Sequence, residues 1–507
     1  MTNRKNTATA AKPARPEDEK LGIGASFAYG FQHVLTMYGG IIAVPLIVGQ
    51  AAGLKSADIG LLIAACLFMG GLATLLQTIG VPFFGSQLPL VQGVSFAGVA
   101  TMVAIVNGGG GLPSVFGAVI VASLIGLAIT PIFSKIIRFF PPVVTGTVIT
   151  IIGLTLMPVA ANWAMGGNSK AANYGSPANI GLAGLTLAIV LLLSKLGNAT
   201  ISRLSILLAM IIGTIVAFFF GMADFSKVGV GPIVDFPTPF HFGLPHFEIA
   251  AIISMVIVIL VTLVETSADI LAVGEIVGTK VDSKRLGNGL RADMISSSVA
   301  PIFGSFTQSA FAQNVGLVAV TGIKSRFVVS AGGVILVILG LLPVMGRVVA
   351  AVPTSVLGGA GIVLFGTVAA SGIRTLSTVS YKNNMNLIIV ATSIGFGMIP
   401  IAAPTFYDKF PTWFGTIFHS GISSAAVMAI LLNLLFNHLK RGNPENPSVF
   451  AAAGTGREIS AELLACLQNG DRCENGKIID AEGQEVPVTG QVPVTEPVKE
   501  PEPKPVH

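Results

Sequence analysis

Apolar stretches separated by short polar loops fill the chain between residues 25 and 438. Fourteen stretches can be counted, and most approach the length of about 20 residues at which a helix crosses a bilayer. They lie near 25–48, 57–80, 87–107, 113–134, 139–161, 179–197, 201–223, 249–274, 286–304, 309–322, 327–346, 352–372, 385–404 and 414–437. The pattern predicts an all-α polytopic membrane protein with polar segments at 1–24 and 439–507.

Two of these stretches, 87–107 and 309–322, are short of apolar residues and rich in Gly, Ser and Gln. The second contains the amide pair Gln313 and Asn314. Lipid offers no hydrogen bonds, so amides at membrane depth must contact protein, water or a ligand. We therefore expect both segments to be interrupted helices that open the membrane interior to something polar.

The two halves of the chain resemble each other. Pro141 and Gly146 recur as Pro353 and Gly358, an offset of 212 residues, and the two interrupted segments have a similar spacing. Each repeat would hold seven spans, an odd number, so the second copy must enter the membrane from the opposite side. The pattern predicts an inverted repeat, for which paired interrupted segments indicate the binding site. Chance alignment of Gly-rich spans is the alternative.

Composition and charge agree with a membrane location. The chain is 52% hydrophobic and 10% charged, whereas soluble domains are about 25% charged. With a cytoplasmic N-terminus, the inner loops and their flanks hold twelve Lys and Arg and the outer loops five, as the positive-inside rule requires. We expect a multi-pass protein of the inner (plasma) membrane with both termini cytoplasmic. The net charge of +5 reflects this orientation, and no nucleic-acid partner is expected.

The polar ends contain few signals. Basic residues near the N-terminus lack an adjacent apolar core, so residues 1–24 are predicted to be a cytoplasmic tail and not a signal peptide. In the tail 439–507, Thr455 and Glu458 could cap a short helix through Leu464. The Pro- and Glu-rich run from Pro487 to Val506 is predicted to be disordered.

Ionisable groups inside spans are costly and usually functional. Here they are His33, Glu265, Asp269, Asp293, Glu275 and His419. Glu265 and Asp269 are four residues apart and share a helix face. Two such carboxylates in a low dielectric are not expected both to be charged, so a proton held there could couple to ligand binding. Alternatively, they form a structural pair satisfied by Ser, Thr or backbone donors.

The other groups have structural alternatives. Asp293 could be a solvated helix-start acid paired with Arg291, and His33 a core histidine bonded across helices. Glu275 is expected to be interfacial, and His419 to be structural. Gln313 and Asn314 suit the donor and acceptor edge of a heterocycle, or they bridge helices.

The equivalent break in the first half holds Ser95 and Phe96. Free backbone N–H groups there could bind a ligand oxygen, and Phe96 could stack on a ring or simply pack. The chain has no zincin, Walker A or nucleophile-elbow motif, which argues against an enzyme or ATP-driven pump. Its three cysteines lack metal-site spacing, and no metal or cofactor is expected.

The pattern Gln313-Asn314-x-Gly316-x4-Thr321-Gly322 resembles the signature of the nucleobase–ascorbate transporter family. Gln32-His33, Glu265, Asp293 and the stretch 357–365 resemble that family too, and the resemblance covers about 25–440. It implies 14 transmembrane segments in a 7+7 inverted repeat, with a core (about 25–134 and 249–346) and a gate (about 139–223 and 352–437). It further implies short strands in segments three and ten, an elevator-like alternating-access mechanism and a homodimer.

The resemblance also implies site roles and proton-coupled nucleobase uptake. Glu265 would bind purine N–H groups, Gln313 would pair with the purine edge, and Phe96 would offer its backbone amide. Ser95 is compatible with a dual-specificity site. His33, Asp269, Asp293 and Asn314 would support affinity and coupling.

Gln at the first signature position implies oxidised purines, xanthine and uric acid, whereas uracil carriers tend to have Glu there. Asp269 is more typical of xanthine carriers. A xanthine-selective permease is therefore one alternative. An anion exchanger of the same architecture is another, but that class is expected to lack a site carboxylate.

Overall fold

The structure, a computed structural model, describes residues 15–133, 140–226, 228–381, 385–439, 472–474 and 477–479. The helix expected up to Leu464 and the disorder expected from Pro487 lie outside the described residues. The chain divides into two units, residues 1–443 and 444–507. In the second, β3 (Arg472–Glu474) pairs with β4 (Lys477–Ile479), an element that the sequence analysis did not expect.

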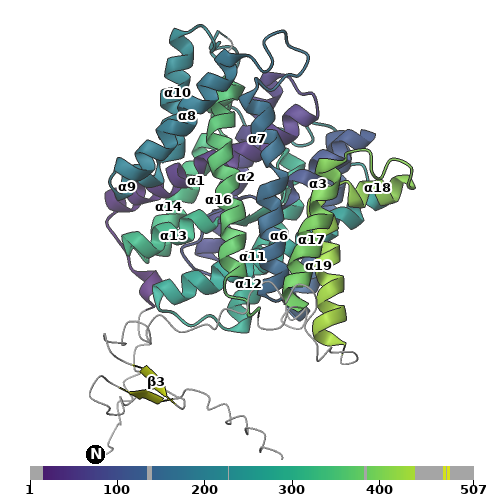
Figure 1. The fold of residues 1–507 in the computed structure, drawn as a ribbon. Helices are drawn as coiled ribbons and strands as arrows, with labels where there is room; N and C mark the ends of the chain where they lie inside the picture. The colour runs from purple at the N-terminus through teal and green to yellow at the C-terminus, as the bar shows by residue number, and fades with distance from the viewer. Residues whose placement is uncertain are drawn as a thin grey trace, which may run out of the picture. The chain divides into compact units, whose positions relative to one another are not determined.

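The first half of the membrane unit contains the elements up to α10 (Figure 1). They are η1 (Pro16–Asp18), α1 (Ile23–Ala51), α2 (Ser56–Ile79), β1 (Gln92–Val94), η2 (Phe96–Gly98), α3 (Val99–Ile105), η3 (Val106–Gly110), α4 (Gly111–Ile129), η4 (Thr130–Ile132), α6 (Pro142–Thr155), α7 (Met157–Ala164), α8 (Pro177–Leu196), α9 (Ala199–Arg203) and α10 (Ser205–Phe219). Proline opens α6 and α8, where its missing N–H costs nothing.

The second half repeats this order of long, interrupted and bent helices. It comprises α11 (Ile249–Val277), α12 (Ser283–Val299), η6 (Ala300–Phe303), β2 (Gln308–Ala310), α13 (Ala312–Thr321), α14 (Arg326–Gly340), α15 (Pro343–Ala350), α16 (Thr354–Leu376), α17 (Met385–Ala402), α18 (Thr412–Phe418), α19 (Gly421–Asn433) and η7 (Leu434–His438). Each of the fourteen expected ranges contains a helix.

Fewer than fourteen helices meet a simple length criterion. Within the described residues, nine are long and apolar enough to cross a membrane, and α14 with α15, bent by 79°, would make a tenth. The second interrupted segment falls short because β2 takes part of its length and α13 has only 10 residues.

The interrupted segments meet as an antiparallel strand pair. β1 and β2 align Gln92 with Ala310, Gly93 with Ser309 and Val94 with Gln308. Each strand leads directly into a helix, and because the strands are antiparallel, η2–α3 and α13 leave from opposite ends of the short pair. A Cβ on Gly93 would lie 2.6 Å from the Phe311 ring, so only glycine fits this close approach. The strands expected in segments three and ten are confirmed.

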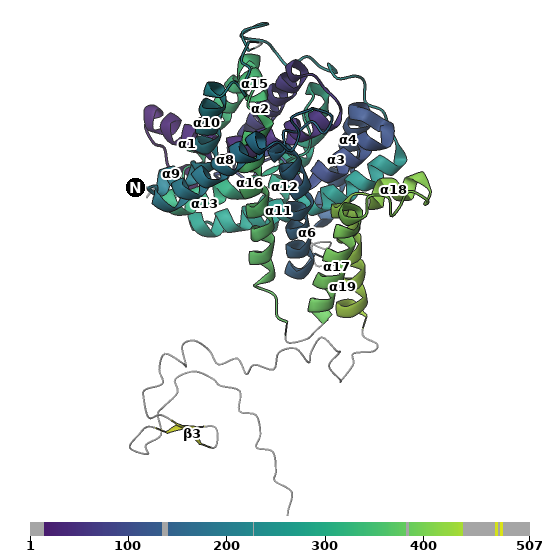
Figure 2. The ribbon, with the colours of Figure 1, turned by 45° about the horizontal axis from the view of Figure 1, so that its top comes forward.

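The helices pack in two groups. In one, which carries the strand pair and is called the site-bearing group, α2 and α1 pack on α14, and α11 and α12 pack on α4. In the second group, α16 packs on α6, α7 and α8, and α17 packs on α19. Figures 1 and 2 show α17 and α19 side by side and α16 near α6.

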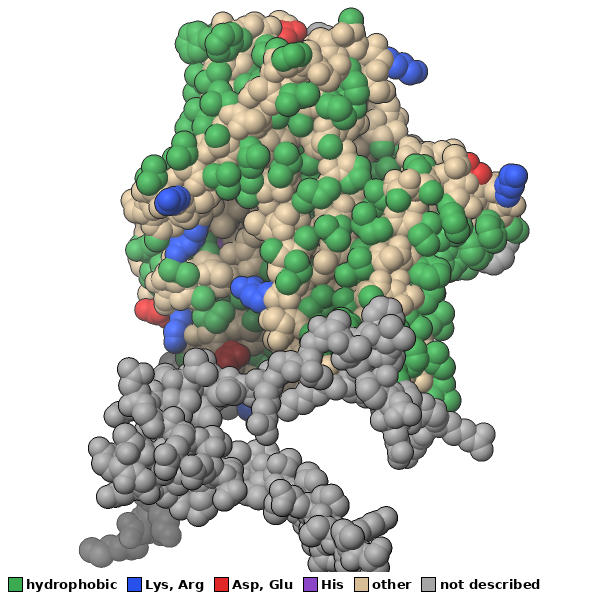
Figure 3. All heavy atoms as spheres, viewed as in Figure 1, with side chains coloured by type: hydrophobic (Ala, Val, Ile, Leu, Met, Phe, Trp, Pro, Cys, Tyr) green, Lys and Arg blue, Asp and Glu red, His purple; other side chains and the backbone are tan. Residues whose placement is uncertain are grey.

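The outer surface of the helices is apolar. Leu196 is 76% exposed and Phe219 81% exposed. Figure 3 shows hydrophobic side chains over most of the visible face and few charged groups. Such a surface is suited to contact with lipid, since the helical backbone is satisfied internally.

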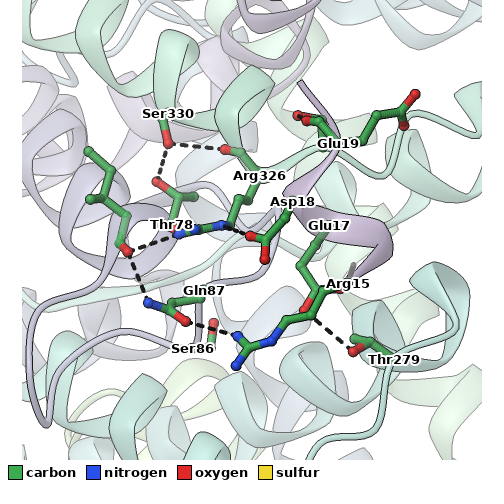
Figure 4. A network of polar contacts seen from close by, with 12 residues as sticks. Arg15, Glu17, Asp18, Glu19, Thr78, Ser86, Gln87, Thr279, Arg326 and Ser330 are labelled. Atoms are coloured by element: carbon green, nitrogen blue, oxygen red, sulfur yellow. Dashed lines mark hydrogen bonds and ion pairs between the residues drawn. The ribbon is translucent and has the colours of Figure 1, made fainter. Parts of the chain in front are cut away.

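Two residues of the N-terminal segment, Glu17 and Asp18, contact the helices. Glu17 is completely buried and forms an ion pair of 2.6 Å with Arg285, and Asp18 pairs with Arg326 at 2.7 Å. Figure 4 shows this segment among side chains of several helices. Both ion pairs lie at the end of the bundle where α1 begins and α2 ends. This end is called the N-terminal face below.

Candidate functional site

The turn after β1 forms one side of the site. The Ser95 hydroxyl accepts the Ala97 N–H at 3.2 Å, and the Ser95 N–H donates to the Thr307 carbonyl at 2.8 Å. The expectation of a free N–H at Ser95 is therefore wrong, because the residue caps η2 and extends the strand pair. Among the described residues, no hydrogen bond engages the Phe96 N–H.

Aromatic rings surround Phe96. Its half-buried ring lies 6.4 Å from Phe311 and 6.2 Å from Phe365, measured between centroids. Phe311 precedes α13, and Phe365 lies on α16 of the second group. The sequence analysis missed both, although Phe365 ends the family-like stretch 357–365.

The first turn of α13 has two faces with different contacts. Asn314 is fully buried, and its Nδ2 donates to the His33 carbonyl and to His33 Nδ1, each at 3.0 Å. Gln313 is exposed, and a Cβ on Gly316 would meet no atom within 4 Å. Asn314 therefore bridges helices, as its structural alternative states, whereas Gln313 and Gly316 face open space.

His33 supports α13 from α1. It is 2% exposed, and its bond to Asn314 confirms the interpretation of a core histidine bonded across helices. Because the amide Nδ2 is a donor, the His33 Nδ1 accepts and the proton of a neutral ring lies on Nε2.

Three carboxyl groups lie on α11 and α12. Glu265 is half-buried, while Asp269 and Asp293 are 9% and 1% exposed. The Thr266 hydroxyl donates to Asp293 Oδ2 at 2.7 Å and accepts the Ala310 N–H at 3.4 Å. Thr266 thus links Asp293 to β2, a role that the sequence analysis missed.

The alternative pairing of Asp293 with Arg291 is wrong. Arg291 donates to the Asn288 side chain at 2.7 Å and to the Phe83 carbonyl at 3.2 Å. One oxygen each of Asp269 and Asp293 has no partner among the described residues. Negative charges on the buried Asp269 and Asp293 with so few donors would be very costly, so this cluster is suited to hold protons.

These parts lie on neighbouring elements. α11 contacts η2, β2 and α13, which brings Glu265, Phe96 and Gln313 to adjoining elements. A half-buried carboxyl group, a planar amide, an aromatic ring and a free N–H can together bind a flat, polar heterocycle.

The remaining ionisable residues, Glu275 and His419, lie away from these elements. Glu275 is exposed near the end of α11. His419 Nε2 lies 3.5 Å from Asp408 Oδ1, beside a cavity of about 560 Å³ between α3 and helices of the second group. Among the described residues, no cluster of His, Cys, Asp and Glu is arranged to hold a metal ion.

Comparisons with known proteins agree with this geometry. The family model described as "Permease family" matches residues 24–406. The uric acid transporter UacT of Escherichia coli (strain K12) is 39% identical over 429 residues, covering 84% of this chain and 89% of UacT. The xanthine permease of Bacillus subtilis (strain 168) is 40% identical over 416 residues, covering 82% and 94%.

Solved structures share the fold at low sequence identity. The transmembrane domain of the cyanobacterial bicarbonate transporter BicA matches with a TM-score of 0.57 and 14% identity, covering 82% of this chain and all of that domain. The structure of SLC26A9 matches with a TM-score of 0.55 and 13% identity, covering 82% and 66%. The all-α 7+7 inverted-repeat fold is confirmed.

Proposed function

The chain belongs to the nucleobase–ascorbate transporter family, and from this premise we propose that it is a proton-coupled symporter of xanthine and uric acid. It is a multi-pass membrane transporter and not an enzyme. The observation that carries the proposal is the meeting of both interrupted segments beside α11. We infer from that meeting that an amide, an aromatic ring and carboxyl groups bind one substrate together.

The substrate contacts follow from the chemistry of an oxidised purine. Its N–H groups pair with Glu265, and its carbonyl and ring edge pair with Gln313. A second carbonyl accepts the Phe96 N–H, and the ring packs against the Phe96 side chain. Asn314 and His33 act by holding α13, and Ser95 by ending β1. Xanthine and uric acid both offer this alternation of donors and acceptors.

Proton coupling is assigned to Asp269 and Asp293. Both are more buried than Glu265, so their charged forms are disfavoured unless a donor approaches. Thr266 lies next to Glu265 and contacts Asp293, so substrate binding and proton binding act on neighbouring residues of α11.

Alternating access would arise from movement of the site-bearing group, acting as the core, against the second group, acting as the gate. Two hydrogen-bond contacts between the two helix groups support an arrangement in which one side of the transporter is closed. The Trp163 indole N–H donates to Gln50 Oε1 at 2.6 Å, and the Thr101 hydroxyl lies 2.8 Å from that of Ser420. Gln313, Gly316 and Ala268 remain exposed, which supports a site open toward the N-terminal face. We place that face in the cytoplasm of a cell with the protein in its inner membrane, as a homodimer.

The proposal is tested by measuring uptake of labelled xanthine and uric acid in cells that lack their own carriers. The assay is run with and without a proton uncoupler. Both substrates are expected to accumulate, and the uncoupler to abolish accumulation. Uptake of xanthine alone would favour the xanthine-selective alternative. If neither substrate enters, purine transport is refuted.

Glu265→Gln is expected to abolish high-affinity uptake while membrane insertion stays intact. Glu275→Gln on the same helix is the matched control, because Glu275 is exposed away from the site. Normal uptake by Glu265→Gln would remove Glu265 from the site.

A further inference from the structure

Buried polar atoms that have no hydrogen-bond partner within the described part of the chain extend from the acid cluster to the N-terminal face. They are Asp293 Oδ1, both amide atoms of Gln92, Gln77 Nε2, Ser86 Oγ and Glu17 Oε2. Each of these residues is at most 1% exposed. Buried polar groups are normally satisfied by protein or by ordered water, so such a series points to a hydrated passage.

The deep end of the series lies behind the strand pair. Asp293 is bonded to Thr266, which accepts the Ala310 N–H. Ala310 is the register partner of Gln92, so the side chains of Ala310 and Gln92 lie on the same face of the strand pair. The Gln92 N–H donates to the Thr74 hydroxyl at 2.9 Å, and Gln77 follows Thr74 by one turn of α2.

The middle of the series lies between α2 and α12, which contact each other. A Cβ on Gly289 would lie 3.2 Å from Gln77 Nε2 and 3.1 Å from Ser86 Cβ. Asp293 follows Gly289 by four residues, about 6 Å along the helix axis. A separation of that length corresponds to one or two water molecules at hydrogen-bond distances of about 2.8 Å.

Glu17 and Ser86 at the outer end are labelled in Figure 4. Gln77 Oε1 accepts the Ser86 N–H at 3.3 Å, and the Ser86 carbonyl accepts Arg285 Nε at 2.6 Å. Arg285 also binds Glu17 Oε1 at 2.6 Å, which leaves Glu17 Oε2 as a buried acceptor. The neighbouring Asp18 instead pairs with Arg326 and is partly exposed.

We propose that Asp293, Gln92, Gln77, Ser86 and Glu17 line a hydrated proton path from the acid cluster to the N-terminal face. The proposal rests on the proton coupling of the proposed function and gives it a route. A proton leaves the Asp293 carboxyl group, passes along water molecules held by the two glutamines and Ser86, and reaches the Glu17 carboxylate and then solvent. No other bond is made or broken. The substrate takes a different route, along Gln313 and Gly316.

The test uses the full chain in proteoliposomes and two measurements. Exchange of labelled xanthine without a pH gradient needs substrate movement alone, whereas accumulation under an imposed pH gradient needs net proton movement. Gln77→Met keeps the side-chain size and removes its polar atoms, and Glu17→Gln removes the terminal acceptor. Both variants are expected to exchange xanthine like the wild type and to lose accumulation.

Two controls separate this role from general damage. Ser123→Ala removes a buried, unpartnered hydroxyl elsewhere, on α4, and Asp18→Asn breaks the neighbouring ion pair. Both are expected to keep exchange and accumulation. The path is overturned if Gln77→Met and Glu17→Gln accumulate fully, or if they lose exchange and accumulation in equal proportion. If Gln77→Met does not fold, Glu17→Gln decides alone.

The outcome for the wild type separates this proposal from the proposed function. A wild type that exchanges xanthine but never accumulates it refutes proton coupling, and the path with it, and leaves purine transport standing. A wild type that does neither refutes purine transport itself.

Discussion

Asn314→Ala is expected to weaken xanthine binding although Asn314 faces away from the substrate space. The substitution removes two hydrogen bonds of 3.0 Å and leaves the buried His33 carbonyl and Nδ1 without their donor. Each bond contributes about 1 kcal/mol net, so the first turn of α13 loses about 2 kcal/mol of anchoring. If xanthine binding must restore the position of this first turn around Gln313, the Kd for xanthine rises about 30-fold.

Equilibrium binding of labelled xanthine to purified protein measures this effect. His33→Ala removes the ring contact and keeps the backbone carbonyl, so it is expected to raise Kd about fivefold, for about 1 kcal/mol. Thr321→Ala is the matched control on α13, because the bonds of its hydroxyl are local: it donates to the Leu317 carbonyl and accepts the Ile323 N–H. A Kd for Asn314→Ala within twofold of the wild type, on the order of 0.4 kcal/mol, would refute the reasoning.

Three further predictions concern selectivity and access. Asp269→Met is expected to change the ratio of xanthine to urate uptake, and an unchanged ratio would exclude Asp269 from selectivity. Gly316→Cys in a cysteine-free background is expected to react with a water-soluble maleimide and to be protected by xanthine, and lack of protection would remove α13 from the substrate route. Trp163→Phe breaks the 2.6 Å bond to Gln50 and is expected to shift the equilibrium between states about fivefold, for about 1 kcal/mol. Slower modification of the Gly316→Cys variant would reveal that shift, and an unchanged rate would show that the bond does not hold this conformation.

Hydropathy predicted the spans well because bilayer thickness sets a length that sequence can display directly. The interrupted segments were also predictable, since Gln313 and Asn314 cannot face lipid. The three-residue strands were expected only from the family resemblance. A strand of that length has no periodicity to detect, and its pairing joins residues more than two hundred positions apart.

Pairings of polar side chains were the least predictable part of the site. Sequence proximity suggested Arg291 for Asp293, yet Thr266 on another helix is its donor. Ser95 was expected to present a free N–H, but the facing strand uses it. Charged residues 17 and 18 looked like part of a solvated tail, because nothing local reveals that Arg285 and Arg326 lie nearby. Each of these wrong predictions concerns a contact between residues that are distant in the sequence.

On two helices, consecutive residues have different roles, one toward the proposed substrate and one in holding the surrounding structure. On α13, Gln313 faces open space while Asn314 anchors the turn to α1. On α11, Glu265 is the proposed substrate contact, while Thr266 donates to Asp293. Successive helical side chains point about 100° apart, so one rigid turn can serve both faces at once. A small movement of α11 on binding a purine would therefore change the hydrogen bond to Asp293 directly, without a longer chain of contacts between substrate and proton.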